Sequence, residues 1–403
     1  MTPQDLDRAD PLAGKRAAFH LPDGVIYLDG NSLGALPHGV RARVAEVVSA
    51  QWGNRLIRGW NECGWMDLPA RVGDRIGRLI GAPPGSVTAA DSTSINVTKA
   101  LTAALGLRPE RRVILSDTGN FPTDLYIAQG VAAMTGTTLR TVAPEDVAAA
   151  IDDRTAVLML TEVDYRTGRK HDMAALTAKA HASGALTVWD LAHSAGAFAV
   201  DVGAARADFA VGCGYKYFNG GPGAPAFIYV APSLQNAVTP VFSGWMGHAA
   251  PFAFEPDYRP ADGVARMTVG TPSVLGLAAL DAALDVWDDV DMGLVTAKSA
   301  ALGDLFIAAL ERGRPELRLA SPRAAAHRGS QVSFHCENGY AVMQALIAEG
   351  VIGDFRAPDL IRFGFTPLYT RYTDVAEAAA ILLRVLDEGL WRRPAYQVKA
   401  RVT

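Results

Sequence analysis

Two apolar segments in the middle of the chain each lead to a side chain that can do chemistry. Trp189 closes the first segment, Asp190 follows it directly, and His193 comes three residues later. The second segment starts at Phe209 and leads to Lys216, just before a turn rich in glycine. Short apolar runs bounded by such turns are typical of buried strands. We therefore expect a carboxylate and an amine at the ends of two neighbouring strands.

A lysine and an acid in this arrangement are what a pyridoxal 5'-phosphate (PLP) enzyme requires. The lysine amine forms a Schiff base with the cofactor, and the acid keeps the pyridine nitrogen protonated so that the ring accepts an electron pair. Lysines suit this role because burial and nearby cations can lower their pKa toward neutrality. Two structural alternatives stay open, since Asp190 can cap a helix and Lys216 can extend along apolar surface to reach water. Their joint placement favours PLP chemistry.

The elements that must position these residues alternate between strand and helix over roughly residues 85–230. This alternation predicts a mostly parallel sheet with right-handed crossovers, and functional loops at the carboxyl ends of its strands, where Thr161 also falls. We expect further strands at residues 131–141 and 155–163, and helices near 38–57, 66–80 and 144–151. A helix from about residue 273 should lead into a smaller domain of strand and helix units.

Composition fits a large soluble enzyme. The chain has 403 residues, of which 49% are hydrophobic and 20% charged, enough to bury a substantial core in two lobes. Its formal charge of −4 argues against binding to nucleic acid or a membrane surface. Three cysteines without a CxxC pair make a disulfide framework unlikely to be the basis of the fold. We expect a cytoplasmic protein, because neither a signal peptide nor an uninterrupted spanning segment is visible.

Motifs along nearly the whole chain resemble the kynureninase family. DLAHSAG and CGYKYFNGGPG, which hold Asp190 and Lys216, are joined in the family's order by NSLG at 31–34, RGWNECGW at 58–65, FPTD at 121–124, YRTG at 165–168, GWMGH at 244–248 and RFGFTPLY at 362–369. The resemblance implies the aspartate aminotransferase fold of PLP enzymes, with a large domain built on a mostly parallel sheet and a smaller α+β domain. On this basis we divide the chain into an N-terminal arm with part of the small domain (1–60), a large PLP-binding domain (61–275) and a C-terminal small domain (276–403).

The cofactor-binding residues are expected in the large domain. Thr93 and Ser94 lie where a helix begins, which suits phosphate binding as well as ordinary N-capping. Phe121 precedes Pro122, Thr123 and Asp124 at the start of another helix; a hydrophobic staple is the structural alternative, and the resemblance implies that the phenyl ring stacks on the cofactor. His193 is a further candidate contact. Tyr215, beside the lysine, is expected to bind phosphate and donate protons, and the catalytic set is Lys216, Tyr215 and Asp190.

The substrate side is expected at Arg362, whose planar guanidinium suits a carboxylate, although a salt bridge to a protein acid remains open. The resemblance implies that Asn31 and Ser32 lie near the active site and that Trp60 lines the pocket for an aromatic substrate. It places Trp60 there from the partner subunit of a homodimer. Across the same two-fold arrangement, Trp245 and Thr271 are expected to reach the neighbour's phosphate.

The resulting hypothesis is a PLP-dependent kynureninase that hydrolyses L-kynurenine to anthranilate and L-alanine. An aminotransferase or a cysteine desulfurase of the same fold would use other chemistry, and the late cysteine available to a desulfurase is Cys336, in a segment that alternates like a strand. A serine hydrolase using Ser32 is the alternative from another class, because Gly30 to Gly34 formally fits G-x-S-x-G. Pro37 argues against that elbow, since a helix can begin only near residue 38. The eight histidines show no metal-ligand spacing, so no metal is expected.

The resemblance also bears on the substrate's ring. Some relatives that prefer 3-hydroxykynurenine, notably animal enzymes, carry asparagine at the position of Thr271. Thr271 together with Trp60 therefore predicts a preference for unsubstituted kynurenine.

Overall fold

A seven-stranded sheet forms the centre of the larger part of the molecule. The computed structural model describes residues 1–398. In spatial order the sheet comprises β4 (Val87–Ala89), β10 (Phe227–Val230), β9 (Phe209–Gly212), β8 (Leu186–Asp190), β7 (Thr155–Thr161), β5 (Val113–Asp117) and β6 (Thr138–Val142). From β9 to β6 all neighbours are parallel, whereas β10 is antiparallel to both β4 and β9. The carboxyl ends of the parallel strands therefore meet at one edge of the sheet.

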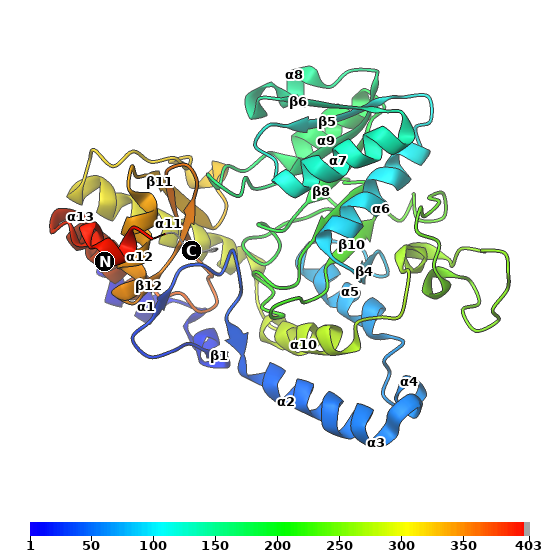
Figure 1. Cartoon of the computed structure of the whole chain (residues 1–403), viewed down its shortest axis with the longest axis horizontal. Helices are drawn as coiled ribbons and strands as arrows, with labels where there is room; N and C mark the ends of the chain where they lie inside the picture. The colour runs from blue at the N-terminus through cyan, green and yellow to red at the C-terminus, as the bar shows by residue number, and fades with distance from the viewer. Residues whose placement is uncertain (399–403) are drawn as a thin grey trace.

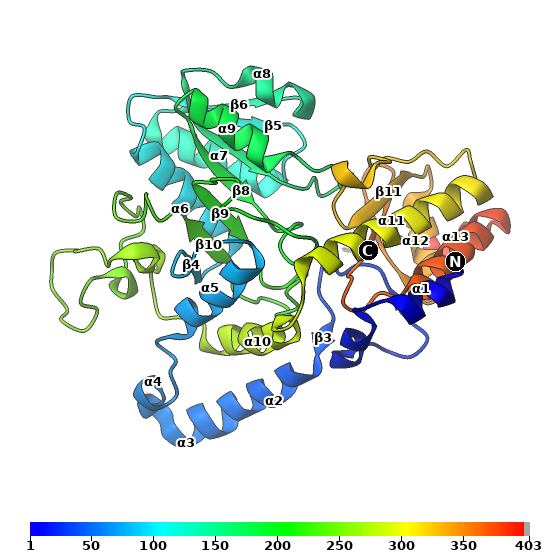
Figure 2. The same cartoon turned by 180° about the vertical axis from the view of Figure 1, so that it is seen from behind.

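Helices cover both faces of this sheet, as Figures 1 and 2 show from opposite sides. In β7 the side chains alternate between two cores: Val157 and Met159 pack in the cluster that contains α6 (Thr93–Gly106) and α7 (Pro122–Thr135), whereas Leu158 and Leu160 pack in the cluster that contains α5 (Leu68–Leu79) and α9 (Met173–Ala182). Because the strand is buried on both sides, its sequence is continuously apolar instead of alternating.

The smaller part contains a three-stranded antiparallel sheet in the order β11 (Gln331–His335), β14 (Leu360–Gly364) and β13 (Asp354–Arg356). Three helices pack with it, namely α11 (Met292–Gly313), α12 (Gly339–Ala348) and α13 (Tyr372–Asp387). The N-terminal segment belongs to this part as well, because α1 (Pro3–Ala9) contacts α13 and β2 (Ile26–Tyr27) pairs with β12 (Val351–Ile352). A short pair, β1 (Phe19–His20) with β3 (Leu36–Pro37), then leads back toward the large sheet.

One helix among residues 1–398, α11, has the length and the apolar composition that a membrane-spanning helix needs. A buried core helix of a soluble protein can have the same length and composition. Leu302, Phe306 and Leu310 of α11 are fully buried against the small sheet and α13. The packing thus accounts for the apolar character of α11.

Two segments project from the body on the side away from the small domain, as both views show (Figures 1 and 2). The first is a helical arm, consisting of α2 (His38–Glu46), a π-helical turn (Val47–Trp52), α3 (Gly53–Arg55), a 3-10 turn (Leu56–Arg58) and α4 (Gly59–Glu62). The second is the long connection from β10 to α10 (Val274–Leu284). We call these segments the arm (38–62) and the projecting loop (231–273).

The predicted α/β architecture, with a mostly parallel sheet and a smaller α+β part, is confirmed. The strand predicted at 131–141 is wrong in its first half, because α7 runs through Thr135 and Gly136, with a φ of 66°, ends the helix before β6 begins at Thr138. Between β6 and β7, a 3-10 turn (Pro144–Asp146) and α8 (Val147–Ala150) form the short helix expected at 144–151.

The three-part division of the chain stays a prediction. The side chains of α10 pack with α2 and α5, in the cluster of the large sheet, and the first buried residue after α10 that belongs to the small core is Leu302 of α11. This packing favours a boundary nearer to α11 than the predicted one at 275/276.

Candidate active site

The carboxyl ends of β7 and β8, the starts of α6 and α7, and the loop after β9 together enclose one cavity, which we call the lysine cavity. Its lining consists of Thr93, Ser94, Phe121, Thr123, Asp124, Thr161, Asp190, Ala192, His193, Tyr215 and Lys216. All but Ala192 were predicted to bind the cofactor. Pro122 does not line the cavity; it is the first residue of α7, where its fixed φ suits the helix start.

Two carboxyl groups meet at the floor of the cavity. Asp190, the last residue of β8, and Asp124, in the first turn of α7, are both buried and hydrogen-bond to each other. Burial and the neighbouring charge of Asp190 raise the pKa of Asp124 well above its ordinary value, so Asp124 keeps the shared proton. Burial also raises the pKa of Asp190, opposed by the charge of Lys216 and by the N–H of Ala192, which donates to Oδ1 at 2.7 Å. A cation at the cavity floor is what would hold Asp190 ionised.

Lys216 approaches the cavity with its amine next to a histidine. Its Nζ lies 3.0 Å from Nε2 of His193, which is buried. Burial, followed by the charges of Lys216 and Arg362, lowers the pKa of His193 well below its ordinary value, so the ring is neutral. Beside them, burial raises the pKa of Tyr215, which therefore keeps its phenolic proton.

The N-terminal NSLG turn packs directly against the lysine loop. The N–H of Gly34 donates to the carbonyl of Tyr215 at 2.8 Å. A Cβ on Gly34 would lie 2.2 Å from the carbonyl oxygen of Lys216 and 2.4 Å from Oδ1 of Asn219. Only glycine allows this approach.

Phe121 lines the cavity, and its backbone is held by Asn120, a residue that was not predicted to belong to the site. Asn120 accepts the N–H of Phe121 at 2.7 Å and donates to Oγ of Ser116 at 2.9 Å, while the hydroxyl of Thr161 donates to its Oδ1. Phe121 also packs edge-on against Tyr165, with ring centroids 5.1 Å apart. An asparagine directly before Phe-Pro is a common turn residue, and this was the available signal.

At the start of α6, one residue caps the helix and the next two line the cavity. From the sequence, Thr93 and Ser94 could have served either purpose. Ser92 is the N-cap, since its hydroxyl accepts the N–H of Ile95. Thr93 and Ser94 are therefore free of that role and line the cavity at the positive end of the helix dipole.

Arg362 is fully buried in β14 and has protein partners for its guanidinium. It pairs with Asp354 of β13, donates to the carbonyl of Tyr165, and donates to Oγ of Ser32 at 2.8 Å. The salt bridge to a protein acid is thus present, through an aspartate that sequence reasoning did not identify. Asn31 lies beside it, and its Nδ2 donates to Oε1 of Gln331 at 3.1 Å.

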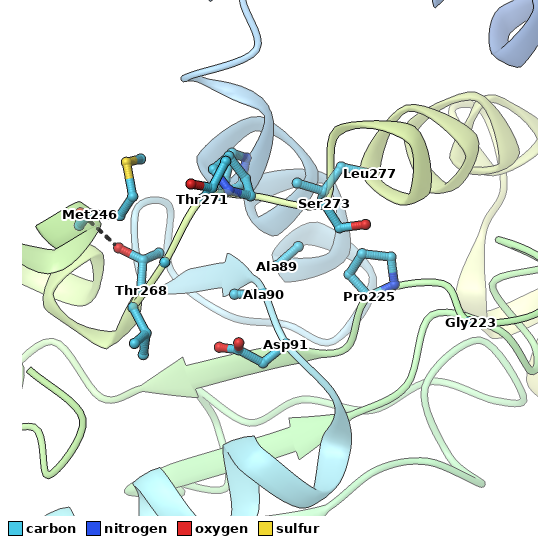
Figure 3. A pocket seen from close by; sticks show the side chains of 14 residues that line it. Ala89, Ala90, Asp91, Gly223, Pro225, Met246, Thr268, Thr271, Ser273 and Leu277 are labelled. Atoms are coloured by element: carbon cyan, nitrogen blue, oxygen red, sulfur yellow. Dashed lines mark hydrogen bonds between the residues drawn. The ribbon is translucent and has the colours of Figure 1, made fainter. Parts of the chain in front are cut away.

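The three residues expected to act across a dimer interface lie away from the lysine cavity of their own chain. The substrate candidates Arg362, Asn31 and Ser32 are not part of the cavity lining either. Trp60 packs edge-on against Trp65 at 5.4 Å in the arm. Trp245 belongs to the projecting loop and is 38% exposed. Thr271 lines a different pocket, between the end of β4 and residues 268–273, which shares no lining residue with the lysine cavity; Figure 3 shows it facing this pocket opposite Ala89, Ala90 and Asp91.

The geometry does not support the hydrolase or desulfurase alternatives. Ser32 is bonded to Arg362, and α2 begins at His38, so no helix follows the serine directly. Cys336 is buried in the small core. Within residues 1–398 no group of three or more histidine, cysteine, aspartate or glutamate side chains could hold a metal ion.

The donor set of the lysine cavity fits PLP. It combines the amine of Lys216, the carboxyl group of Asp190, the ring of Phe121 and the N-terminus of α6. Because burial raises the pKa of Asp190, a nearby cation is required to keep it ionised. These groups match an aldehyde, a pyridinium nitrogen, a ring face and a phosphate, respectively.

Comparisons with known proteins agree with this site. Residues 295–382 match the family described as "Kynureninase C-terminal domain". Kynureninase from Pseudomonas fluorescens is 53% identical over 99% of this chain and 98% of its own, and that from Deinococcus radiodurans is 55% identical over 95% of both. A solved structure of the C-DES protein, a mutant with glycine covalently linked to its PLP cofactor, superposes with a TM-score of 0.79 at 19% identity, over 91% of this chain and 98% of that one. That likeness confirms the predicted fold of the PLP-dependent enzymes, and the full-length identities show that the chain belongs to the kynureninase family.

Proposed function

We propose that this protein is a PLP-dependent hydrolase that cleaves L-kynurenine with water to anthranilate and L-alanine, and that the lysine cavity is its active site. The observation that carries the proposal is the convergence of Lys216, Asp190 and Phe121 on one cavity at the carboxyl edge of the sheet. The family relationship supplies the substrate.

Bound PLP supplies an aldehyde that takes up amines and a pyridinium ring that accepts an electron pair from a neighbouring carbon. Asp190 would hold the proton on the ring nitrogen, and Asp124 in turn donates its shared proton to Asp190. Thr93 and Ser94 would hold the phosphate at the start of α6. Phe121 would contact the ring, and Thr161 lies beside Asp124 with its hydroxyl bonded to Asn120.

Lys216 moves protons during the reaction. With its amine free, Lys216 would remove the proton from Cα of the substrate and return it before the product leaves. Water adds to the γ-carbonyl, the bond between Cβ and Cγ breaks, and anthranilate leaves as Cβ takes up a proton to form alanine. Burial raises the pKa of Tyr215, so it keeps its phenolic proton, and we assign it the role of proton donor in these steps.

Arg362 is our candidate for binding the α-carboxylate of the substrate, with Asn31 and Ser32 beside it. Its existing pair with Asp354 means that a substrate carboxylate competes with this acid for the guanidinium. Fixing the carboxylate sets the orientation of the bonds at Cα and Cβ, and this is how Arg362 contributes to rate as well as affinity.

A homodimer with shared active sites accounts for the residues that lie far from the lysine cavity. The arm exposes Trp52, Leu56 and Ile57, the last being 77% exposed. The projecting loop exposes Phe252 and Phe254 next to Trp245. Large apolar side chains gathered on projecting segments are typical of subunit interfaces. In this arrangement Trp60, Trp245 and Thr271 complete the partner's site. We place the enzyme in the cytoplasm, with no nucleic-acid or membrane partner.

The decisive experiment is the visible spectrum of the purified protein, repeated after borohydride reduction and peptide mapping. We expect a yellow protein that is labelled at Lys216 and that releases fluorescent anthranilate from L-kynurenine. Labelling at another residue would refute the site. A labelled Lys216 without anthranilate, but with glutamate formed from 2-oxoglutarate, would make the enzyme an aminotransferase.

Thr271 and Trp60 support a preference for the unsubstituted ring. We expect kcat/KM for L-kynurenine to exceed that for 3-hydroxykynurenine in parallel assays on the wild-type enzyme. Faster cleavage of the hydroxylated substrate would contradict this assignment.

A further inference from the structure

The buried amide of Gln331 has a fixed orientation. Gln331 is the first residue of β11 in the small domain and is only 1% exposed. Its Nε2 donates to the carbonyl oxygen of Asp164 at 3.1 Å and to that of Tyr165 at 3.0 Å. Main-chain carbonyls can only accept, so these two bonds use both amide hydrogens. The reversed amide would set oxygen against two oxygens at the same distances. Oε1 therefore points the other way, as an acceptor, and one of its partners is Nδ2 of Asn31, which donates to it at 3.1 Å.

That acceptor decides which nitrogen of His193 carries the hydrogen. Oε1 of Gln331 lies 3.0 Å from Nδ1 of His193, so Nδ1 must be the protonated nitrogen. Since the ring is neutral, Nε2 has a free lone pair, and it faces Nζ of Lys216 at 3.0 Å. The polarity of the whole chain of hydrogen bonds follows from two carbonyl groups of the 164–165 loop.

We propose that Gln331 is a positioning residue for the lysine amine: it holds His193 as the Nδ1–H tautomer, whose Nε2 accepts a hydrogen from Lys216 and so orients the amine. This inference deepens the proposed function and rests on it. Gln331 reaches across from the small domain, whereas His193 and Lys216 belong to the large one.

Gln331 also connects the Lys216 amine to Arg362, the predicted binding residue for the substrate carboxylate. Arg362 also donates to the carbonyl of Tyr165, so this oxygen accepts from both Gln331 and Arg362. The two side chains come from neighbouring strands, because Gln331 pairs with Gly364 and Ser333 pairs with Arg362. Ser333 itself donates to the next carbonyl, of Arg166. Three residues of one small-domain sheet thus bind one loop, and only Gln331 continues to the lysine.

Ser333 provides the matched control, since it makes the same kind of contact to the loop without touching His193. In Gln331→Met the ring loses its acceptor and the tautomer is no longer fixed. We expect kcat to fall by about 10- to 100-fold and KM to change much less, since the amine is misplaced and Arg362 keeps its own contacts, although Asn31 loses its bond to Oε1. Ser333→Ala should keep kcat within about threefold of wild type.

A readout independent of turnover is the pH titration of the visible band of the holoenzyme. A neutral acceptor facing the lysine nitrogen favours its protonated form, so the midpoint should fall by about one pH unit in Gln331→Met and stay unchanged in Ser333→Ala. Equal midpoints in all three proteins would overturn the proposal.

Gln331→Glu separates tautomer control from simple packing. One oxygen of its carboxylate still accepts from Nδ1 but raises the pKa of His193, so Nε2 becomes protonated at lower pH and can no longer accept. The other oxygen cannot donate to the carbonyls of Asp164 and Tyr165, so both of those bonds are lost. We therefore expect kcat of this variant to rise with pH to a plateau below the wild-type value, whereas Gln331→Met stays low throughout. This variant also serves if Gln331→Met fails to load the cofactor.

A purely structural role for Gln331 would give both variants the same pH-independent loss, and that result would contradict the proposal. If wild-type enzyme releases no anthranilate, the proposed function fails. The visible titration still tests the Gln331 contact in that case, because it needs no substrate.

Discussion

At the scale of single residues, the two buried acids at the floor of the lysine cavity have different tasks. Asp190 must carry the charge, whereas Asp124 keeps the shared proton and acts as a donor. Asp190→Asn should lower kcat by about 10²- to 10³-fold, since it removes the charge opposite the ring nitrogen. Asp124→Asn should cost less than about tenfold, because an amide N–H can still donate to Asp190. Steady-state release of anthranilate measures both, and equal losses would refute the division of roles.

A third buried acid, Glu162, makes stability depend on pH. It follows Thr161 at the end of β7 and is 6% exposed, and burial raises its pKa from the ordinary 4.5 to about 7. Between these values the unfolded chain has released the proton and the folded protein still holds it, so stability falls as pH rises from about 4.5 to 7. The full effect above pH 7 is at most ~3 kcal/mol.

Glu162→Gln has no proton to lose and should remove this dependence. We expect Tm of the variant to match wild type near pH 5 and to exceed it at pH 8, measured by thermal denaturation. The exposed Glu110→Gln is the control and should follow the wild-type curve at both pH values. A variant less stable than wild type at pH 8 would show that Glu162 is ionised and paired in the folded protein.

At the scale of elements, the lysine loop is positioned by contact with the NSLG turn from the other end of the chain. Gly34→Ala would set its Cβ 2.2 Å from the carbonyl oxygen of Lys216, so one of the two segments must shift. We expect a loss of ~1–3 kcal/mol in stability and a fall in kcat of at least about tenfold.

Gly130→Ala is the matched control for that substitution. Gly130 is exposed within α7, and a Cβ there meets nothing within 4 Å. This change should leave kcat unchanged and stabilise the protein by ~0.5–1 kcal/mol, because alanine favours the helix. Denaturant titration and assays of both variants test the prediction, and an active Gly34→Ala enzyme would show that the turn does not set the position of Lys216.

At the scale of the whole molecule, the arm and the projecting loop extend away from the small domain (Figures 1 and 2). Both segments expose large apolar side chains. If they complete the partner's site, two defective subunits can complement each other. We expect Lys216→Ala and Trp245→Ala enzymes each to be nearly inactive. An equal mixture after subunit exchange should regain about a quarter of wild-type activity, from the one intact site of each hybrid dimer.

The complementation assay would give a different result if the two subunits did not share their active sites. If each subunit held a complete site, Lys216→Ala and Trp245→Ala would both stay defective in any hybrid, and mixing would restore nothing. Sedimentation of the mixture checks that dimers form, so that failure to associate is not mistaken for failure to complement.

The features of the site that depend on consecutive residues could be predicted from the sequence, whereas contacts between distant segments could not. The strand that ends in Asp190, the strand that ends four residues before Lys216, and the helix starts near Thr93 and Phe121 leave local patterns, because a strand buried on both faces and a helix cap depend on consecutive residues. The strand predicted at 131–141 failed for a local reason as well: Val131 to Thr135 suit a helix as well as a strand, and the glycine that ends α7 was the deciding signal.

The sequence by itself determined the chemistry of this protein: which side chains are available, which strand ends present them, and which family shares the motifs. The tertiary structure alone decided their partners. Gln331 and His193 are 138 positions apart, and Asn120 and Thr161 are 41 apart. Asp354 meets Arg362 only because two antiparallel strands pair in one register. Contacts of this kind follow from sheet register and from the docking of one domain on another, which no local periodicity records.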